Sequence, residues 1–172
     1  FDLAHELIGA DHSGPTWVEA RGTFHPDGPF EDPVTFAVRA RYGRHGDVEL
    51  AVNLGPGPSL KLEGEKGWVA ASRDVFSASA SGLSQELRQR HAVPVSDAEA
   101  AHLENWLDCL ATRARPAADV EIGHRSTTVC HLFTLALQLQ RPLEWNPERQ
   151  AFPANDPADG LLRRAERAGW RA

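Results

Sequence analysis

The stretch that decides the fold is residues 34–54, VTFAVRARYGRHGDVELAVNL, in which apolar and polar side chains alternate on both sides of a short loop. One face of the first half carries Val34, Phe36, Val38, Ala40 and Tyr42, and one face of the second half carries Val48, Leu50, Val52 and Leu54. Alternation with a period of two is typical of a strand with one buried face. The short loop at 43–47 predicts that the two strands form an antiparallel hairpin.

Strand-like segments continue on both sides of this hairpin. Residues 16–23 precede it, with a longer turn at 25–29, and residues 59–63 and 67–71 follow it. Short connections between neighbouring strands require antiparallel pairing, so we expect a meander of five strands. The proline-rich run at 55–58 is expected to be a bulged connection within it.

The two faces of the predicted sheet differ in character. The apolar face should be covered by helices. The opposite face carries Trp17 together with arginines and glutamates, among them Glu19, Arg21, Arg39 and Glu49. This polar face is either solvated or an interface between subunits, and the pattern alone leaves both interpretations open.

Helical patterns lie before and after the strands. Residues 1–9 are typical of the last turns of a helix that ends at Gly9. Residues 96–99 form a capping box, followed by an apolar stripe of Leu103, Trp106, Leu107 and Leu110. A longer helix should run from about Val120 or Ser126 to Gln140, and a last one from Asp156-Pro157 to about Ala168. The sequence therefore predicts an α+β fold: an open, largely antiparallel β-sheet meander with helices packed on one face.

Composition limits the possible functions. The chain has 172 residues, 41% of them hydrophobic, five tryptophans and a net charge of −6. This is typical of a globular domain, and we expect residues 1–172 to form a single one. The negative charge opposes nonspecific nucleic-acid binding, and no stretch is apolar enough for a membrane helix, so neither is an expected partner. The chain has no Met and starts within a helical pattern, so we expect Phe1 to be a cut within a longer protein.

The common catalytic templates are missing from the sequence, which has no GxGxxG, GxxxxGK[ST], HExxH or GxSxG motif. Cys109 and Cys130 are too far apart for a CxxC metal site, and we expect both to be small buried residues. The histidine pairs lack acidic or cysteine partners at ligand spacing, so no metal site is expected.

Two polar clusters are candidates for ligand contact. Asp11 and His12 lie in a loop directly after the first helix, where they could face a substrate or simply form an Asx turn with a surface histidine. His124 and Arg125 lie near the start of the long helix, where the helix N-terminus would add affinity for an anion. Capping and salt bridging are the alternative roles for this second pair.

Six segments of the sequence together carry a resemblance to a known family: residues 119–132 (DVEIGHRSTTVCHL), 141–147 (RPLEWNP), 102–109 (HLENWLDC), 1–4 (FDLA), 11–15 (DHSGP) and 63–68 (EGEKGW). They resemble the C-terminal domain of the glucose-fructose oxidoreductase / inositol dehydrogenase / MocA (Gfo/Idh/MocA) oxidoreductase family, in its bacterial-type subgroup. The likeness spans nearly the whole chain, except for residues 74–95.

The resemblance implies a two-domain parent protein, in which an N-terminal Rossmann domain binds NAD or NADP. It also implies that the face of the C-terminal sheet opposite the helices makes a subunit interface. Members of the family mostly oxidise or reduce sugars, cyclitols or polyols, and some hydrolyse glycosides. Their catalytic lysine lies in the Rossmann domain, and because Asp2 matches a conserved Asp, their catalytic Asp and His would fall before Phe1. The chain should then hold no catalytic residue and bind no cofactor itself.

The resulting hypothesis is a C-terminal domain that supplies a wall of the substrate pocket and a subunit interface, and that is inert alone. Asp11, His12, His124 and Arg125 are the predicted contacts to sugar hydroxyls. The alternatives are a stand-alone carbohydrate-binding or assembly module without catalysis, and a domain of an NAD-dependent glycosidase. A homo-oligomer through the sheet face is expected, and both the cytoplasm and the periplasm of a bacterium stay open as its location.

Overall fold

The computed structural model describes residues 1–24, 33–43, 48–53, 60–64, 67–71, 76–79 and 95–163. The chain divides into two compact units. Unit 1 consists of Phe1–Leu54 and His124–Ala172, and unit 2 consists of Gly55–Gly123. The predicted turn at 25–29, most of the loop at 43–47 and the connection at 55–58 lie outside the described residues.

Unit 1 contains an antiparallel sheet in the order β3-β2-β1-β7. Its strands are β1 (Trp17–Phe24), β2 (Pro33–Tyr42), β3 (Val48–Asn53) and β7 (Leu143–Glu144). The pairing of the first three strands confirms the predicted antiparallel order. Strand β7 was not predicted, because two residues are too few to show an alternating pattern; it pairs with the start of β1.

The register explains which face is buried. Val18 of β1 lies opposite Ala40 of β2, which lies opposite Leu50 of β3, and Leu143 of β7 lies on the other side of Val18. All four side chains are at most 2% exposed. This row crosses the whole sheet and forms one layer of the hydrophobic core. The adjacent row, which starts at Trp17, points to the opposite face, as the alternation predicts.

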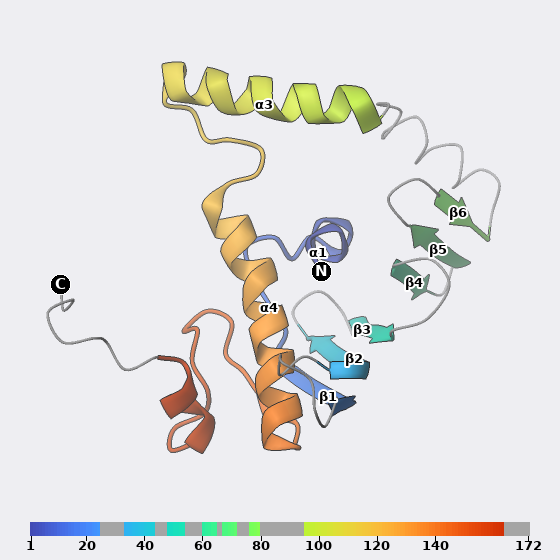
Figure 1. Ribbon diagram of the computed structural model, residues 1–172, viewed down its shortest axis with the longest axis vertical. Helices are drawn as coiled ribbons and strands as arrows, with labels where there is room; N and C mark the ends of the chain where they lie inside the picture. Colours follow the sequence, from blue (N-terminus) through green and yellow to red (C-terminus); the bar gives the residue numbers. More distant parts are fainter. Residues whose placement is uncertain are drawn as a thin grey trace, which may run out of the picture. The chain divides into compact units, whose positions relative to one another are not determined.

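Two helices of unit 1 complete this core. Helix α1 (Asp2–Ile8) ends at Gly9, whose φ of 69° is the left-handed conformation expected at this position. Helix α4 (Val120–Leu139) belongs to unit 1 from His124 onward and buries Val129, Leu132, Phe133, Ala136 and Leu137. The C-terminal part of α4 lies next to the sheet (Figure 1), and Leu137 approaches β1 at Gly22, where an added Cβ would lie 3.2 Å from the Leu137 Cδ2 atom.

The last predicted helix begins at Asp156-Pro157 as expected. Within the described residues it is shorter than expected. Asp156 caps a 3₁₀ helix, η1 (Pro157–Leu161), and its side chain accepts a hydrogen bond from the Ala158 N–H. Residues 162 and 163 no longer belong to the helix, and residues 164–172 lie outside the described part of the chain.

Unit 2 shows that the predicted five-strand meander is wrong in one respect. Strands β4 (Leu60–Gly64), β5 (Gly67–Ala71) and β6 (Phe76–Ala78) form a separate three-stranded antiparallel sheet, in the order β4-β5-β6. The sequence between β3 and β4 contains Pro56 and Pro58, which have no N–H to donate to a ladder. The α+β class with open antiparallel sheets is confirmed.

Unit 2 also contains helix α3 (Val95–Thr112). The helix begins before Ser96, so Ser96 is not its N-cap as the capping box predicted. Leu103, Trp106, Leu107 and Leu110 do lie on this helix, yet they are between 47% and 60% exposed. The stripe is therefore not buried among the described residues.

The prediction that both cysteines are small buried residues is wrong for Cys130. Cys109 is half-buried and Cys130 is exposed, so Cys130 is not a core residue. The physical reason is its place on α4. Val129 and Leu132 face the core, and Cys130 lies on the other side of the helix with Sγ 3.6 Å from the Ser126 carbonyl oxygen.

Candidate functional site

Asp11 and His12 lie in the loop between α1 and β1, as predicted. Asp11 is half-buried and His12 is exposed. The turn is closed by the backbone, because Ser13 N–H donates to the Ala10 carbonyl at 2.9 Å. Among the described residues neither side chain makes a hydrogen bond, so the Asx turn, which was the alternative role for Asp11, does not form there.

His124 and Arg125 lie on α4, but they do not lie at its N-terminus. The helix begins at Val120, with the Asp119 Oδ1 atom accepting a hydrogen bond from the Glu121 N–H at 2.8 Å. The two residues therefore stand in the second turn. The predicted anion affinity of a helix end does not apply there, because it is confined to the first turn.

Both side chains instead bind one loop, residues 146–151, which follows β7. The His124 Nε2 atom lies 2.5 Å from the Gln150 Oε1 atom. The Arg125 guanidinium donates to the Pro147 carbonyl oxygen. The two side chains thus hold the loop at two points three residues apart.

The loop after α1 reaches the same segment. An added Cβ at Gly14 would lie 3.3 Å from the Pro147 Cβ atom, so the two loops are in close contact. Pro147 is thus touched by the loop that carries Asp11 and His12 and by Arg125 of α4. Loop 146–151 therefore contacts both the loop that carries Asp11 and His12 and the part of α4 that carries His124 and Arg125. The two residue pairs are more than 100 residues apart in sequence.

Loop 146–151 has a defined internal structure. The Asn146 side-chain oxygen accepts hydrogen bonds from the backbone N–H groups of Glu148 and Arg149, at 3.0 and 2.9 Å. Asn146 and Ala151 pair through both backbone bonds. The Asn146-Pro147 pair is a turn signal in the sequence, so the turn could have been predicted there. Its role as the meeting point of the two clusters could not.

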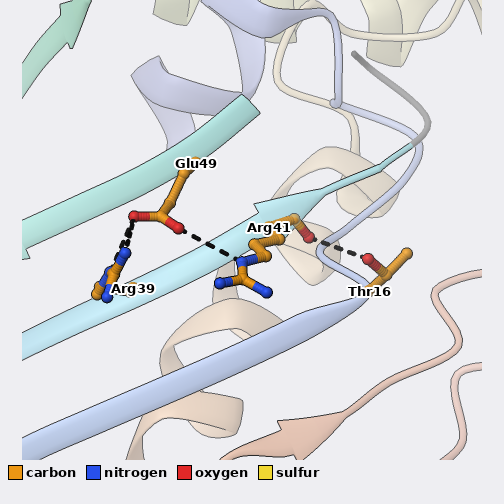
Figure 2. A network of polar contacts seen from close by, with 4 residues as sticks. All are labelled: Thr16, Arg39, Arg41 and Glu49. Carbon is orange, nitrogen blue, oxygen red and sulfur yellow. Dashed lines mark hydrogen bonds and ion pairs between the residues drawn. The ribbon is translucent and has the colours of Figure 1, made fainter. Parts of the chain in front are cut away.

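A second polar site occupies the sheet face opposite the core. Figure 2 shows the Glu49 carboxylate between two arginines of β2. Arg39 binds one carboxylate oxygen through Nε at 2.8 Å and Nη2 at 2.5 Å, and Arg41 Nε lies 3.4 Å from the other oxygen. The Arg39 hydrogen bond is the main cause that lowers the pKa of Glu49, and the Arg41 hydrogen bond adds to it.

The same row continues to an aromatic ring. The Arg41 guanidinium carbon lies 4.4 Å from the centre of the Trp17 ring, a cation–π contact, and the Thr16 hydroxyl donates to the Arg41 carbonyl at 3.2 Å. Nearby, Arg21 pairs with Glu19 at 3.1 Å. A face with an aromatic anchor and arginines already paired within the chain resembles the composition of protein interfaces.

The described part of the chain has no candidate metal site and no candidate membrane-spanning helix. There, no group of three or more His, Cys, Asp or Glu side chains is placed to hold a metal ion. No helix of the described ranges is both long and apolar enough to cross a membrane.

These features define a class of protein: an α+β domain with open antiparallel sheets, a helix-covered face and a polar face that carries paired charges. Residues 62–172 match the family model of the Gfo/Idh/MocA oxidoreductase family, described as its C-terminal alpha/beta domain. The chain belongs to this family. Comparisons with curated proteins and with solved structures found no significant match.

Proposed function

We propose that the chain supplies a wall of the substrate pocket and a subunit interface in an NAD(P)-dependent oxidoreductase that acts on a sugar or polyol. The observation that carries this proposal is the family match over residues 62–172, which runs through both units. In this proposal the chain is the C-terminal domain of a longer parent protein and is inert alone.

The family implies NAD or NADP, and the described residues do not fit such a cofactor. Dinucleotides bind at the carboxyl ends of parallel strands, beside a glycine-rich turn that opens a helix. Every strand pair described here is antiparallel, and the sequence has no GxGxxG motif. The cofactor and the hydride transfer would therefore belong to the rest of the parent, and this chain's residues would bind and orient the substrate.

The proposed substrate wall consists of the loop after α1 and loop 146–151. Asp11 and His12 would contribute direct hydrogen bonds to sugar hydroxyls, because both side chains are at least partly exposed and make no hydrogen bond to the described residues. His124 and Arg125 would contribute by fixing loop 146–151 through Gln150 and Pro147.

Steady-state kinetics of the parent protein test this wall. In His12→Ala we expect the KM for the substrate to rise, or kcat to fall, by about tenfold, because one hydrogen bond to a hydroxyl is lost. The melting temperature should not change, since His12 is exposed. His131→Ala, an exposed histidine on α4, is the matched control. Equal kinetics for both variants would remove His12 from the site.

Two alternative functions differ from this proposal in the domain encoded before Phe1 and in the products that the parent protein would form. A stand-alone carbohydrate-binding or assembly module would have no GxGxxG-containing domain encoded before Phe1. A domain of an NAD-dependent glycosidase would have one, but the parent would release a free sugar from a glycoside without net reduction of NAD. Sequencing upstream and analysing the products separate the three possibilities.

A further inference from the structure

The pairing between β1 and β7 continues in the segments that precede β1 and follow β7. Strand β7 pairs with the first two residues of β1. One residue further out, the Trp145 N–H donates to the Thr16 carbonyl at 3.0 Å. The same register places Gly14 opposite Pro147, and a Cβ added at Gly14 would lie 3.3 Å from the Pro147 Cβ atom. The contact between the two loops is therefore an extension of the sheet register.

Gly14 and Pro147 form a tight and buried contact. Both residues are buried. The distance of 3.3 Å is shorter than the optimum of about 3.5–4.0 Å between two carbon atoms, so the position leaves no room for a side chain at residue 14. Proline has no N–H to donate to a ladder. The place of Gly14 therefore depends on its packing against the proline ring.

Two side chains fix the position of Pro147. The Arg125 guanidinium donates to the Pro147 carbonyl oxygen. The Asn146 Oδ1 atom accepts hydrogen bonds from the N–H groups of Glu148 and Arg149, at 3.0 and 2.9 Å, and so closes the turn that contains Pro147. Both of these bonds go to the side-chain oxygen, which an aspartate carries as well.

The loop between α1 and β1, which carries His12, is fixed at both ends. Near its start, the Ser13 N–H donates to the Ala10 carbonyl at 2.9 Å. At its end, Gly14 packs against Pro147. One residue separates His12 from Gly14, so a displacement of Pro147 also displaces the backbone at His12.

We infer that Asn146 and Pro147 are positioning residues, which set the place of the loop with Asp11 and His12 through the contact at Gly14. They act through this loop and not through the substrate. The inference rests on the proposed function, in which Asp11 and His12 contact the substrate. It deepens that proposal, because it names the residues that determine how the loop is presented.

Two-dimensional NMR of the 172-residue chain tests the position of the loop. Asn146→Ala removes the oxygen that closes the turn, so Pro147 moves and the amide signals of residues 11–14 should shift. Asn146→Asp keeps the oxygen and should shift these signals far less. Unshifted signals in a folded Asn146→Ala variant would overturn the inference.

Asn105→Ala is the matched control. The Asn105 Oδ1 atom accepts from the Ala117 N–H at 2.9 Å, which is the same kind of contact in unit 2. This variant should lower the melting temperature as Asn146→Ala does, and should leave the signals of residues 11–14 in place. Equal shifts in both variants would overturn the inference, because the signals would then report lost stability rather than a moved loop.

Gly14→Ala tests the contact itself. The added Cβ lies 3.3 Å from the Pro147 Cβ atom, so one of the two loops must move and the signals of residues 11–13 should shift. In the double variant Gly14→Ala/Pro147→Gly the opposing Cβ is gone, so most of this shift should reverse. Residues in direct contact give such non-additive effects. Shifts that simply add in the double variant would contradict the inference.

Steady-state kinetics of the parent protein test the functional part. Asn146→Ala should raise the KM for the substrate about fivefold and change kcat less than about twofold, because it displaces binding groups. Asn146→Asp should restore KM to within about twofold of the unchanged protein, and Asn105→Ala should leave it unchanged. If His12→Ala impairs the kinetics and Asn146→Ala does not, the inference is overturned and the proposed function stands. If His12→Ala has no effect, the proposed function fails, and the NMR shifts alone decide whether Asn146 and Pro147 position the loop.

Discussion

At the residue scale, His5 and Tyr42 form a polar contact within the core. Both side chains are 0% exposed, and the His5 Nε2 atom lies 2.8 Å from the Tyr42 hydroxyl. The rings meet edge to face, with centres 5.4 Å apart. Burial is the main cause that raises the pKa of Tyr42, so the phenol stays protonated at physiological pH. The contact ties α1 to the middle of the sheet.

Tyr42→Phe tests the energetic value of this contact. The variant keeps the ring and loses the hydroxyl, so the buried imidazole of His5 loses one hydrogen bond. We expect the free energy of unfolding to fall by about 1–3 kcal/mol, the cost of leaving a buried polar group without such a bond. Urea denaturation monitored by tryptophan fluorescence measures it. An unchanged midpoint and slope would show that the bond contributes nothing net.

Asp156 carries a second stabilising contact and a pH dependence. Its carboxylate binds Arg141, which is the main cause that lowers its pKa, and it also accepts from the Ala158 N–H. A lowered pKa in the folded state gives stability that is present above the unfolded pKa of about 3.9. That stability is lost as the pH falls through the folded value.

Asp156→Asn keeps the capping hydrogen bond and removes the charge. At pH 6 we expect the variant to melt at a lower temperature than the unchanged chain. The difference should shrink as the pH falls from about 4 to 2, because the wild-type carboxyl becomes protonated there. Thermal melts followed by circular dichroism across this range measure it. A difference that stays constant with pH contradicts the assignment of the effect to the Asp156 charge.

The residues differ in how well the sequence predicts them. The buried row of Val18, Ala40 and Leu50 follows from alternation alone. The N-cap at Asp156 could also be predicted, because an Asp followed by a Pro is typical of a helix start. The bond from Arg125 to the Pro147 carbonyl could not be predicted, because any backbone carbonyl can accept and only the fold brings this one near.

At the element scale, the packing of α4 on β1 depends on a glycine. An added Cβ at Gly22 would lie 2.4 Å from the Thr35 carbonyl oxygen of β2 and 3.2 Å from Leu137 of α4. The first distance is far below any normal contact, and its partner is backbone. Gly22 thus allows β1, β2 and α4 to approach at one point.

Gly22→Ala should therefore destabilise the chain by about 1–3 kcal/mol through overpacking. Gly123→Ala is the matched control, because an added Cβ at this position of α4 meets nothing within 4 Å. Alanine favours a helix over glycine, so the control should gain up to about 1 kcal/mol. Chemical denaturation of both variants measures the contrast. The same sign for both would contradict this account of the packing.

The elements were predictable where they were long and periodic. Helix α4 and the hairpin of β2 and β3 follow from sustained apolar patterns, and their positions are confirmed. Strands β6 and β7 have three and two residues, too few for a pattern to be recognised. The separation into two sheets was missed because one meander and two separate sheets both consist of short strands joined by turns.

At the scale of the whole molecule, the polar sheet face is the feature most closely tied to the proposed subunit interface. Trp17, Arg41, Glu49 and Arg39 form one connected set across three strands. Figure 2 shows the two arginines beside the Glu49 carboxylate, so the charges are already paired inside the chain. Burying paired charges against a second copy costs less than burying single ones. The same face on two copies could meet around a two-fold axis.

The most direct test of this central claim is the mass of the chain in solution, measured by light scattering at two concentrations. The unchanged chain should be a dimer or larger at both, and folded Trp17→Glu and Arg39→Glu variants should be monomers. Trp106→Glu, which changes an exposed tryptophan of α3, should keep the mass of the unchanged chain. A monomer at both concentrations, or an oligomer that survives Trp17→Glu and Arg39→Glu, would contradict the account.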